Sequence, residues 1–438
     1  MNRNLKVLLF VPVLMALLFS SVGAQGLPTI DPKQVGLSPE RLKRIAPVFQ
    51  EYVDQNKIAG AVTLIARNGK VAYLKSFGVS DVETKKPMTA DNMFRIASMT
   101  KPFTSVAVMI LQEEGRILLN DPISKYIPEF KNPKVLIPPK EGTGEPTIVP
   151  AKSEITIRQL LSHTSGLTYV FQGKKPWSEI YKKAGIIDGL KQTNDRIGDK
   201  MKVLGGLPLM FNPGEGWEYS LSTDVLGYLV EVVSGKTLGE FLEERVFKPL
   251  RLKDTYFFVP EAKVPRLAAV HTPTEQGGLR KLEGQVDIGD LSFSTDFQYN
   301  SPKTYFCGGG GMVSTISDYA RFAQMLLNGG ELDGVRILSR KSIESMIINQ
   351  IGDLFVYPRY RLIAGDKFGL GFAVRTEKGQ YDLLESTGTY TWSGIFYTRF
   401  FVDPKEKLIS ILMTQLFPYA HLTLHEQFRV LTYQAITK

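Results

Sequence analysis

Strand patterns lie at the two ends of the chain and enclose a long region of helical patterns. Two apolar runs, 61–66 and 71–77, flank Asn68-Gly69, an arrangement that is typical of a β-hairpin. Further strands are expected over 368–374, 380–384, 394–402 and 408–414. This order predicts an α+β fold in which strands from both termini form one antiparallel sheet flanked by helices. A mainly helical lobe, roughly residues 115–310, is expected as an insertion.

The expected helices have apolar residues at three- and four-residue spacing. Two of them begin at Thr237 and Thr315, whose partners Glu240 and Asp318 stand three residues later, as in a capping box. The helices are expected at about 38–53, 98–115, 155–163, 178–204, 222–234, 237–247, 316–327 and 422–436. A cleft is expected where the helical lobe meets the sheet.

The first 24 residues have the layout of a secretory signal peptide. Arg3 and Lys6 precede the apolar run 7–19, and the small residues 22–24 offer a cleavage site. We therefore expect cleavage after Ala24, a mature domain of residues 25–438 without a stable membrane span, and a periplasmic or secreted location. An uncleaved inner-membrane anchor is the alternative.

The composition of the chain excludes several classes of protein. Its 53 Lys and Arg against 44 Asp and Glu give a formal net charge of +9. These cations form no long run, so no nucleic-acid partner is expected. Cys307 is the single cysteine and forbids an internal disulfide. His421 and His425 lie one helical turn apart, yet zinc needs three or four ligands. We expect neither a metal nor a cofactor, and the sequence indicates no particular oligomeric state.

The segment Ser98-Met99-Thr100-Lys101 is the single Ser-x-x-Lys in the sequence and opens an apolar helix. Positions i and i+3 share a helix face, so the Ser98 hydroxyl and the Lys101 amine can meet. A serine hydroxyl is a weak nucleophile until a base accepts its proton, and a buried lysine can be that base. Free amides at a helix start also favour negative charge. Ser98 is therefore a candidate nucleophile; a serine N-cap followed by a solvated lysine is the structural alternative.

Two further segments supply candidates for the same chemistry. Tyr219 precedes the helix expected over 222–234, and a tyrosine beside a cationic lysine can approach phenolate and relay a proton. Trp392-Ser393-Gly394 lies next to an expected strand, where a glycine lets a ligand approach the backbone. The amide of Ile395 could then pair with that of Ser98 around an oxyanion. The structural alternatives are a core tyrosine and a bulge beside a core tryptophan.

Taken in order, these motifs resemble the serine β-lactamase-related superfamily, and within it the family VIII carboxylesterases, relatives of class C β-lactamases. The resemblance runs from about residue 35 to about residue 436 and rests on the segments 98–101, 157–167, 217–227, 308–315 and 392–394. It implies a β-lactamase/transpeptidase-like fold and acylation of Ser98. It also implies that Lys101 and Tyr219 share proton transfer, while residues 392–395 supply substrate contacts and an oxyanion amide.

Two departures from the family pattern bear on the substrate. Class C β-lactamases and related peptidases usually carry Asn where this chain has Leu221, and Lys or His where it has Trp392, whereas the esterase branch shows a tryptophan at the latter place. Both changes remove polar groups that recognise β-lactams and peptidyl carboxylates. The resemblance therefore implies an esterase acting on a small-molecule ester or amide, with Leu221, Trp392, Ser393 and Gly394 near the substrate. The predicted signal peptide makes it an exported esterase. The alternatives are a β-lactamase or D-amino-acid peptidase, and a sensor or binding module that stays acylated without turnover.

Two remaining features are assigned structural roles. The glycine run 308–311 has no following Lys-Ser or Lys-Thr, which favours a close-packed turn over a phosphate loop. His163 is expected to be a structural histidine that makes a hydrogen bond. Gly-x-Ser-x-Gly occurs nowhere in the chain, which argues against the nucleophile elbow of α/β-hydrolases.

Overall fold

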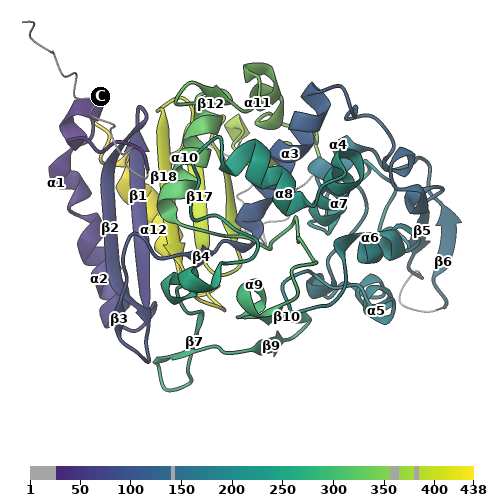
Figure 1. The fold of residues 1–438 in the computed structure, drawn as a ribbon, viewed down its shortest axis with the longest axis horizontal. Coiled ribbons are helices and arrows are strands. Elements are labelled where there is room, and N and C mark those ends of the chain that lie inside the picture. The colour runs from purple at the N-terminus through teal and green to yellow at the C-terminus, as the bar shows by residue number, and fades with distance from the viewer. Residues whose placement is uncertain (1–25, 140–143, 355, 357–364, 379–383) are drawn as a thin grey trace, which may run out of the picture.

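One antiparallel sheet organises the molecule (Figure 1). The computed structural model describes residues 26–139, 144–354, 356, 365–378 and 384–438. The eight strands of the sheet lie in the order β14-β15-β16-β17-β18-β1-β2-β3, so N-terminal and C-terminal strands are neighbours. In its centre, β1 pairs with β18 from Ala61 opposite Thr414 to Arg67 opposite Leu408. The prediction of one sheet built from both termini is confirmed.

The strands of this sheet are long in its centre and short at its edges. They are β1 Gly60–Arg67, β2 Lys70–Asp81, β3 Lys86–Pro87, β14 Lys367–Phe368, β15 Ala373–Val374, β16 Tyr390–Gly394, β17 Thr398–Asp403 and β18 Leu408–Thr414. Paired short strands elsewhere are β4 Phe94–Arg95 with β11 Val313–Ser314, β5 Lys134–Ile137 with β6 Thr147–Pro150, β7 His271–Pro273 with β8 Leu279–Lys281, β9 Gln285–Ile288 with β10 Leu291–Ser294, and β12 Glu331–Leu332 with β13 Val335–Arg336.

Turn residues decide where these strands end. Asn68 and Gly69 both have positive φ, 54° and 78°, as a type I′ hairpin between β1 and β2 requires. The strand expected over 394–402 begins at Thr398, because the chain reverses after Gly394 and Tyr397 adopts a φ of 69°. The strand expected over 368–374 is split into β14 and β15. Residues 380–383 of the strand expected over 380–384 lie outside the described residues.

The helices surround the sheet and fill the region beside it. They are α1 Pro39–Leu42, α2 Ile45–Asp54, α3 Lys101–Glu113, α4 Ile157–Leu161, α5 Trp177–Lys183, α6 Ile197–Gly205, α7 Ser222–Ser234, α8 Leu238–Leu242, α9 Phe297–Asn300, α10 Ile316–Leu327, α11 Arg340–Met346 and α12 Leu424–Tyr433. The single helix expected over 178–204 is two helices, because Gly185 and Gly189 between them take φ of 71° and 75°. Within the described ranges, no helix has both the length and the hydrophobicity that crossing a membrane requires.

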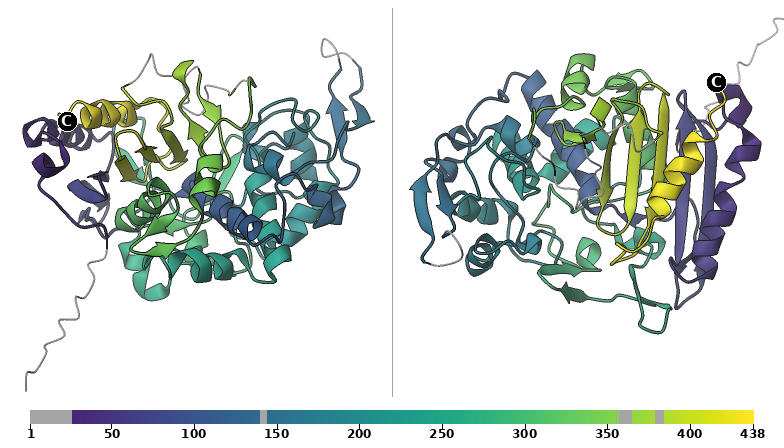
Figure 2. Two further views of the ribbon diagram at one scale, coloured as in Figure 1. Left: turned by 90° about the horizontal axis from the view of Figure 1, so that it is seen from above. Right: turned by 180° about the vertical axis from the view of Figure 1, so that it is seen from behind.

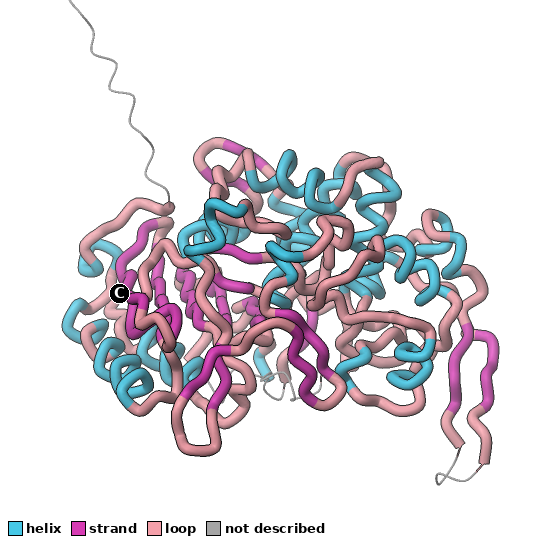
Figure 3. Tube along the Cα trace, turned by 60° about the horizontal axis from the view of Figure 1, so that its bottom comes forward, coloured by secondary structure: helices cyan, strands magenta, loops and turns pink. Residues whose placement is uncertain are grey.

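Helices cover both faces of the sheet, which explains why every residue of β1 is buried. Alternate side chains of β1 enter different cores: Ala61 and Ile65 pack with residues of α2 and α12, and Val62 and Leu64 pack with residues of α3 and α10. Figure 2 shows α2 and α12 on the outer face. On the other side, the helical region extends away from the sheet and ends in the β5–β6 hairpin, which projects from the body in Figure 3. The functional candidates lie at the border between sheet and helices.

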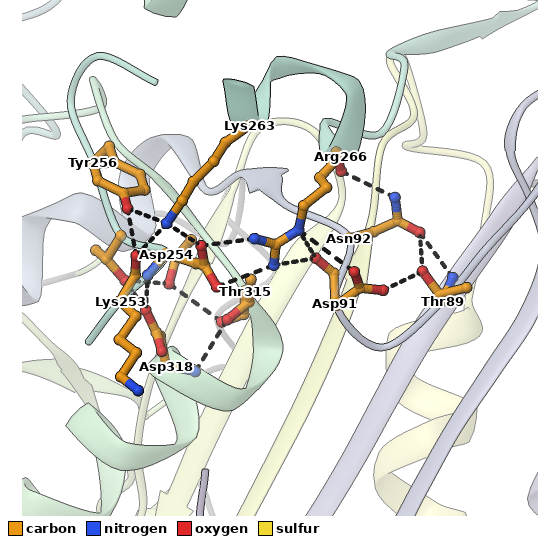
Figure 4. Close-up of polar contacts among 12 residues, drawn as sticks. Thr89, Asp91, Asn92, Lys253, Asp254, Tyr256, Lys263, Arg266, Thr315 and Asp318 are labelled. Carbon is orange, nitrogen blue, oxygen red and sulfur yellow. Dashed lines mark hydrogen bonds and ion pairs between the residues drawn. The ribbon is translucent and has the colours of Figure 1, made fainter. Parts of the chain in front are cut away.

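A buried ionic cluster holds the chain that leads into this border (Figure 4). The Asp254 carboxylate, 3% exposed, accepts from Lys263 Nζ and Arg266 Nη1, each at 2.8 Å. Arg266 Nη2 also donates to the carbonyl of Asp91 at 2.7 Å. Because Asp91 precedes β4, this cluster anchors the strand that runs into Ser98.

We expect Asp254→Ala to lower the free energy of unfolding by about 2 kcal/mol, since it leaves two half-buried cations without their carboxylate. Chemical denaturation of the purified variant measures this loss. Asp91→Ala is the matched control, because the Asp91 side chain is 68% exposed and lies 3.5 Å from Arg266 Nε. Its cost should stay within about 0.5 kcal/mol. Equal losses in the two variants would contradict the assignment.

Candidate active site

A pocket of about 590 Å³ opens where the end of β16 meets the turn before α3. Its walls include side chains or backbone of Ser98, Tyr169, Phe171, Tyr219, Trp392 and Ile395. These residues come from four separate stretches of the sequence, and aromatic rings form much of the surface. The pocket therefore lies at the border between sheet and helical lobe, where a cleft was expected.

Ser98 stands in a short 3₁₀ turn, Ala97–Thr100, that runs directly into α3. The preceding Ala97 has a φ of 43°, in the left-handed region that non-glycine residues rarely adopt. Such a conformation persists only where the surroundings enforce it, and Ala97 is 1% exposed within a hydrophobic cluster. This bend brings Ser98 to the pocket surface.

The three side chains predicted to be catalytic meet in this pocket. Lys101 Nζ lies 3.3 Å from Ser98 Oγ, and the Tyr219 hydroxyl lies 2.6 Å from the same oxygen. Lys101 Nζ also lies 4.6 Å from the centre of the Tyr219 ring. Tyr219 lies in the segment that leads into α7, three residues before the first residue of that helix. The arrangement joins a nucleophile to two groups that can exchange its proton.

The Lys101 amine is 1% exposed and has three acceptors. Besides Ser98, it donates to the carbonyl of Gly309 at 2.6 Å and to the hydroxyl of Tyr169 at 3.0 Å. An ammonium group has three donors, and this environment offers one acceptor for each of them. The glycine run 308–311 thus forms a close-packed turn, as expected, and this turn carries one of the acceptors.

Tyr169 is a site residue that sequence reasoning missed. Burial raises the pKa of its phenol well above the ordinary value, so the group stays a neutral hydroxyl. Its ring stacks on Phe171 with centroids 4.7 Å apart. The one available signal was its place two residues after the segment 157–167, which carried part of the family resemblance.

Asp188 is a second residue of the pocket wall that the sequence did not predict, and no motif pointed to it. Its two carboxylate oxygens accept the amides of Val170 and Phe171 at 2.9 and 3.0 Å and so hold the turn that follows Tyr169. Burial raises the pKa of Asp188 to about 7. The pocket wall therefore contains an acidic group rather than a cation.

The segment Trp392-Ser393-Gly394 forms the end of β16 and reaches the nucleophile's turn. A Cβ on Gly394 would lie 2.3 Å from the carbonyl oxygen of Ile96, two residues before Ser98. The glycine is thus required for close packing of two backbones. Ile395 and Ser98 both line the pocket, as the oxyanion prediction requires. Trp392 packs against Tyr219 with ring centroids 5.3 Å apart.

Gly394→Ala should lower kcat/KM by about 10²-fold, because the added Cβ forces β16 away from the turn that bears Ser98. Overpacking should also cost about 2 kcal/mol of stability. Ester hydrolysis assays and thermal unfolding measure the two effects. Gly206→Ala is the control, since a Cβ there meets its nearest atom at 3.6 Å and its φ is −85°. Unchanged activity in Gly394→Ala would contradict this role.

The structure places two other residues away from the pocket. Leu221, expected near the substrate, is fully buried before α7 and is absent from the described pocket wall, because its apolar side chain joins the main core. His163 is also buried, and its Nδ1 lies 3.1 Å from Ser220 Oγ. Burial lowers the pKa of His163 well below its usual value, which leaves the ring neutral. Among the described residues, no group of His, Cys, Asp or Glu could hold a metal ion.

Several known proteins are similar to this chain over most of its length. Protein Rv1367c of Mycobacterium tuberculosis is 33% identical over 379 residues, which cover 84% of this chain and 88% of that protein. Esterase EstB of Burkholderia gladioli is 29% identical over 397 residues, or 88% of this chain and 93% of that protein. The solved structure of EstCE1, described as a hydrolase with promiscuous acyltransferase activity, has a TM-score of 0.76 and 27% identity and covers 91% of this chain and 99% of its own.

A more distant structure, the penicillin-binding protein homologue from Pyrococcus abyssi, shares the fold with a TM-score of 0.63 and 21% identity over 88% of this chain and 76% of its own. The predicted transpeptidase-like fold and the esterase relationship are confirmed. Residues 45–433 match the family described as Beta-lactamase. Because that match spans most of the sequence, the chain belongs to the Beta-lactamase family and is a serine hydrolase of the β-lactamase fold.

Proposed function

We propose that this protein is an exported carboxylesterase that cleaves uncharged esters through an acyl-enzyme on Ser98. The observation that carries the proposal is the contact of Ser98 Oγ with both the Tyr219 hydroxyl and Lys101 Nζ, at 2.6 and 3.3 Å, at the edge of an aromatic pocket. The printed name of the relative EstB, an esterase, supports the same activity.

In the proposed acylation, Tyr219 is the base. Lys101 Nζ lies 3.3 Å from Ser98 Oγ and 4.6 Å from the centre of the Tyr219 ring, so a positive charge there would stabilise negative charge that develops during proton transfer. Ser98 donates its proton to the Tyr219 phenolate and attacks the ester carbonyl carbon. The amides of Ser98 and Ile395 stabilise the oxyanion. When the tetrahedral intermediate collapses, the carbon–oxygen bond to the alcohol breaks, and the alcohol takes the proton from Tyr219.

Deacylation follows the reverse path. A water molecule gives its proton to the Tyr219 phenolate and attacks the acyl carbon. The bond to Ser98 Oγ then breaks, the carboxylic acid leaves, and Tyr219 returns the proton to Ser98. Each half of the cycle thus uses the same three side chains.

The pocket walls support a preference for uncharged esters over β-lactams. The described residues that line the pocket include Asp188 but no Lys or Arg. Trp392 stands where class C β-lactamases and related peptidases usually carry a cation for a substrate carboxylate. A negatively charged substrate would face Asp188 without a compensating partner, which costs binding energy. A neutral small-molecule ester avoids this cost, and nothing in this surface calls for a nucleic-acid partner.

Export is part of the proposal and rests on the layout of residues 1–24, which lie outside the described residues. Expression of the full chain should yield a periplasmic or secreted protein that begins after Ala24. N-terminal sequencing of the fractionated protein tests this step, and an uncut protein in the membrane fraction would contradict it.

A comparison of substrates tests the activity itself. Wild-type protein should hydrolyse p-nitrophenyl butyrate with a higher kcat/KM than nitrocefin. Faster nitrocefin turnover would contradict the proposal and favour a β-lactamase. Intact-mass spectrometry after mixing with ester should show free enzyme within minutes. An acyl adduct that persists for hours would instead support a sensor that does not turn over.

A further inference from the structure

A fully buried carboxylate lies behind the catalytic lysine. Asp224 stands in the first turn of α7, five residues after Tyr219, and is 0% exposed. Ionised carboxylates are rarely buried without a partner, because desolvation is costly. The mechanism described above does not use Asp224, so its place needs a separate explanation.

Several charged or titratable groups from neighbouring segments surround Asp224. Lys101 on α3 is the cation that faces it, and the Cys307 thiol and Tyr169 hydroxyl lie against its carboxylate. Tyr305 and Asp188 also interact with its charge. Burial raises the pKa of Asp224, and Lys101 is the largest opposing influence. The neutral phenols and thiol leave Lys101 and Asp224 as the opposite charges of this cluster.

A single residue, Gly309, connects the two charges through its two neighbouring peptide groups. The Gly309 carbonyl accepts from Lys101 Nζ at 2.6 Å, and the Gly309 amide donates to Asp224 Oδ1 at 3.3 Å. A Cβ on Gly309 would lie 2.5 Å from Asp224 Oδ2 and 2.6 Å from the Tyr169 oxygen. The carboxylate and the phenol therefore both lie where a side chain at position 309 would stand, and only glycine fits there.

Tyr169 provides a second connection. Its oxygen accepts from Lys101 Nζ at 3.0 Å and lies beside Asp224 Oδ2, a buried oxygen that has no hydrogen-bond partner among the described residues. Among the described residues, no carboxylate lies within ion-pair distance of Lys101, so its charge is balanced across these two intermediates. Peptide and phenol dipoles that point from a cation to an anion stabilise both in a low-dielectric interior.

We propose that Asp224 is the counter-ion of Lys101, coupled to it through Gly309 and Tyr169, and that it holds the lysine as an ammonium so that Tyr219 receives the Ser98 proton. Asp224 touches neither Ser98 nor the pocket surface and is therefore a positioning residue. The inference deepens the proposed function and rests on it, because it concerns the charge state that the proposed mechanism requires.

Asp224→Asn tests this proposal, since asparagine keeps the side-chain shape and the acceptor for the Gly309 amide but removes the charge. The rate of p-nitrophenyl butyrate hydrolysis is measured from about pH 5 to about pH 10, with the Ser98→Ala background subtracted. Loss of a nearby negative charge makes proton release easier, so both limbs of the kcat/KM profile should move to lower pH by about one unit. Activity at the optimum should fall about tenfold.

Asp318→Asn is the matched control. Asp318 is also 0% exposed in the first turn of a helix and accepts a backbone amide, that of Asp254 at 2.7 Å, but it is not part of the pocket wall. Its pH limbs should stay in place, whatever its effect on stability. A folded Asp224→Asn with unmoved limbs, or equal shifts in both variants, would overturn the proposal.

Two further measurements keep the test decisive. If Asp224→Asn fails to fold, Tyr169→Phe removes one of the two connections and should move the limbs in the same direction; unmoved limbs in that variant overturn the coupling. The pH dependence of Ser98 labelling by a fluorophosphonate, followed by intact mass, requires no ester turnover. A protein without esterase activity but with the expected labelling shift would disprove the proposed function and leave the Asp224 assignment standing.

Discussion

Replacing Ser98 with alanine should lower kcat/KM for p-nitrophenyl butyrate by at least about 10⁴-fold. The change removes the nucleophile and leaves the pocket walls intact. Lys101 and Tyr219 then have no oxygen between them that can attack, so only binding and the backbone amides remain to accelerate hydrolysis by water. The assay compares initial rates of the variant with those of wild type at equal protein concentration.

A serine outside the pocket serves as the control for this substitution. Ser76 lies on β2, far along the sheet from the pocket, and Ser76→Ala should keep activity within about twofold, as surface substitutions usually do. Intact-mass spectrometry with a fluorophosphonate should label wild type and Ser76→Ala once and leave Ser98→Ala unlabelled. Activity above a tenth of wild type in Ser98→Ala would show that another residue is the nucleophile.

Tyr219→Phe should lower kcat by about 10³-fold, within the range of general acid–base contributions. The substitution keeps the ring, and with it the packing on Trp392, but removes the hydroxyl that lies 2.6 Å from Ser98 Oγ. Ser98 then has no phenolate to accept its proton, and the leaving alcohol has no donor. Pre-steady-state release of p-nitrophenol isolates the acylation step and should show the full loss.

Tyr52→Phe controls for the loss of a tyrosine hydroxyl. Tyr52 lies on α2 on the far face of the sheet, with its hydroxyl 3.4 Å from Thr423 Oγ1, and its variant should act like wild type. If Tyr219→Phe retains activity while Lys101→Met abolishes it, Lys101 is the base instead. That outcome would also contradict the role proposed for Asp224.

Local features of the sequence were enough to predict the parts of the site that lie close together in the chain. Ser98 and Lys101 are three residues apart, and helical geometry alone brings them to one face. The Asn68-Gly69 turn and the capping box of Thr237 with Glu240 act within four residues and are found as predicted. Such short-range patterns depend little on the rest of the fold.

Contacts between residues that lie far apart in the sequence were harder to predict from the sequence. Tyr169 reaches Lys101 across 68 residues, and Gly309 reaches it across 208. No periodicity or motif records such a meeting, because it depends on how the helical lobe packs against the sheet. Leu221 shows the same limit: its place in the motif suggested a substrate contact, and packing placed it in the core.

The sequence by itself determined the order of strands and helices, the nucleophile's turn and the family, because hydrophobic periodicity, capping and ordered motifs are properties of short segments. Tertiary structure alone decided which carboxylate faces the lysine, which phenol joins it and which residues form the pocket wall. The physical reason is that burial and charge pairing depend on distances between segments that the chain brings together only when the sheet and the helical lobe close around Ser98.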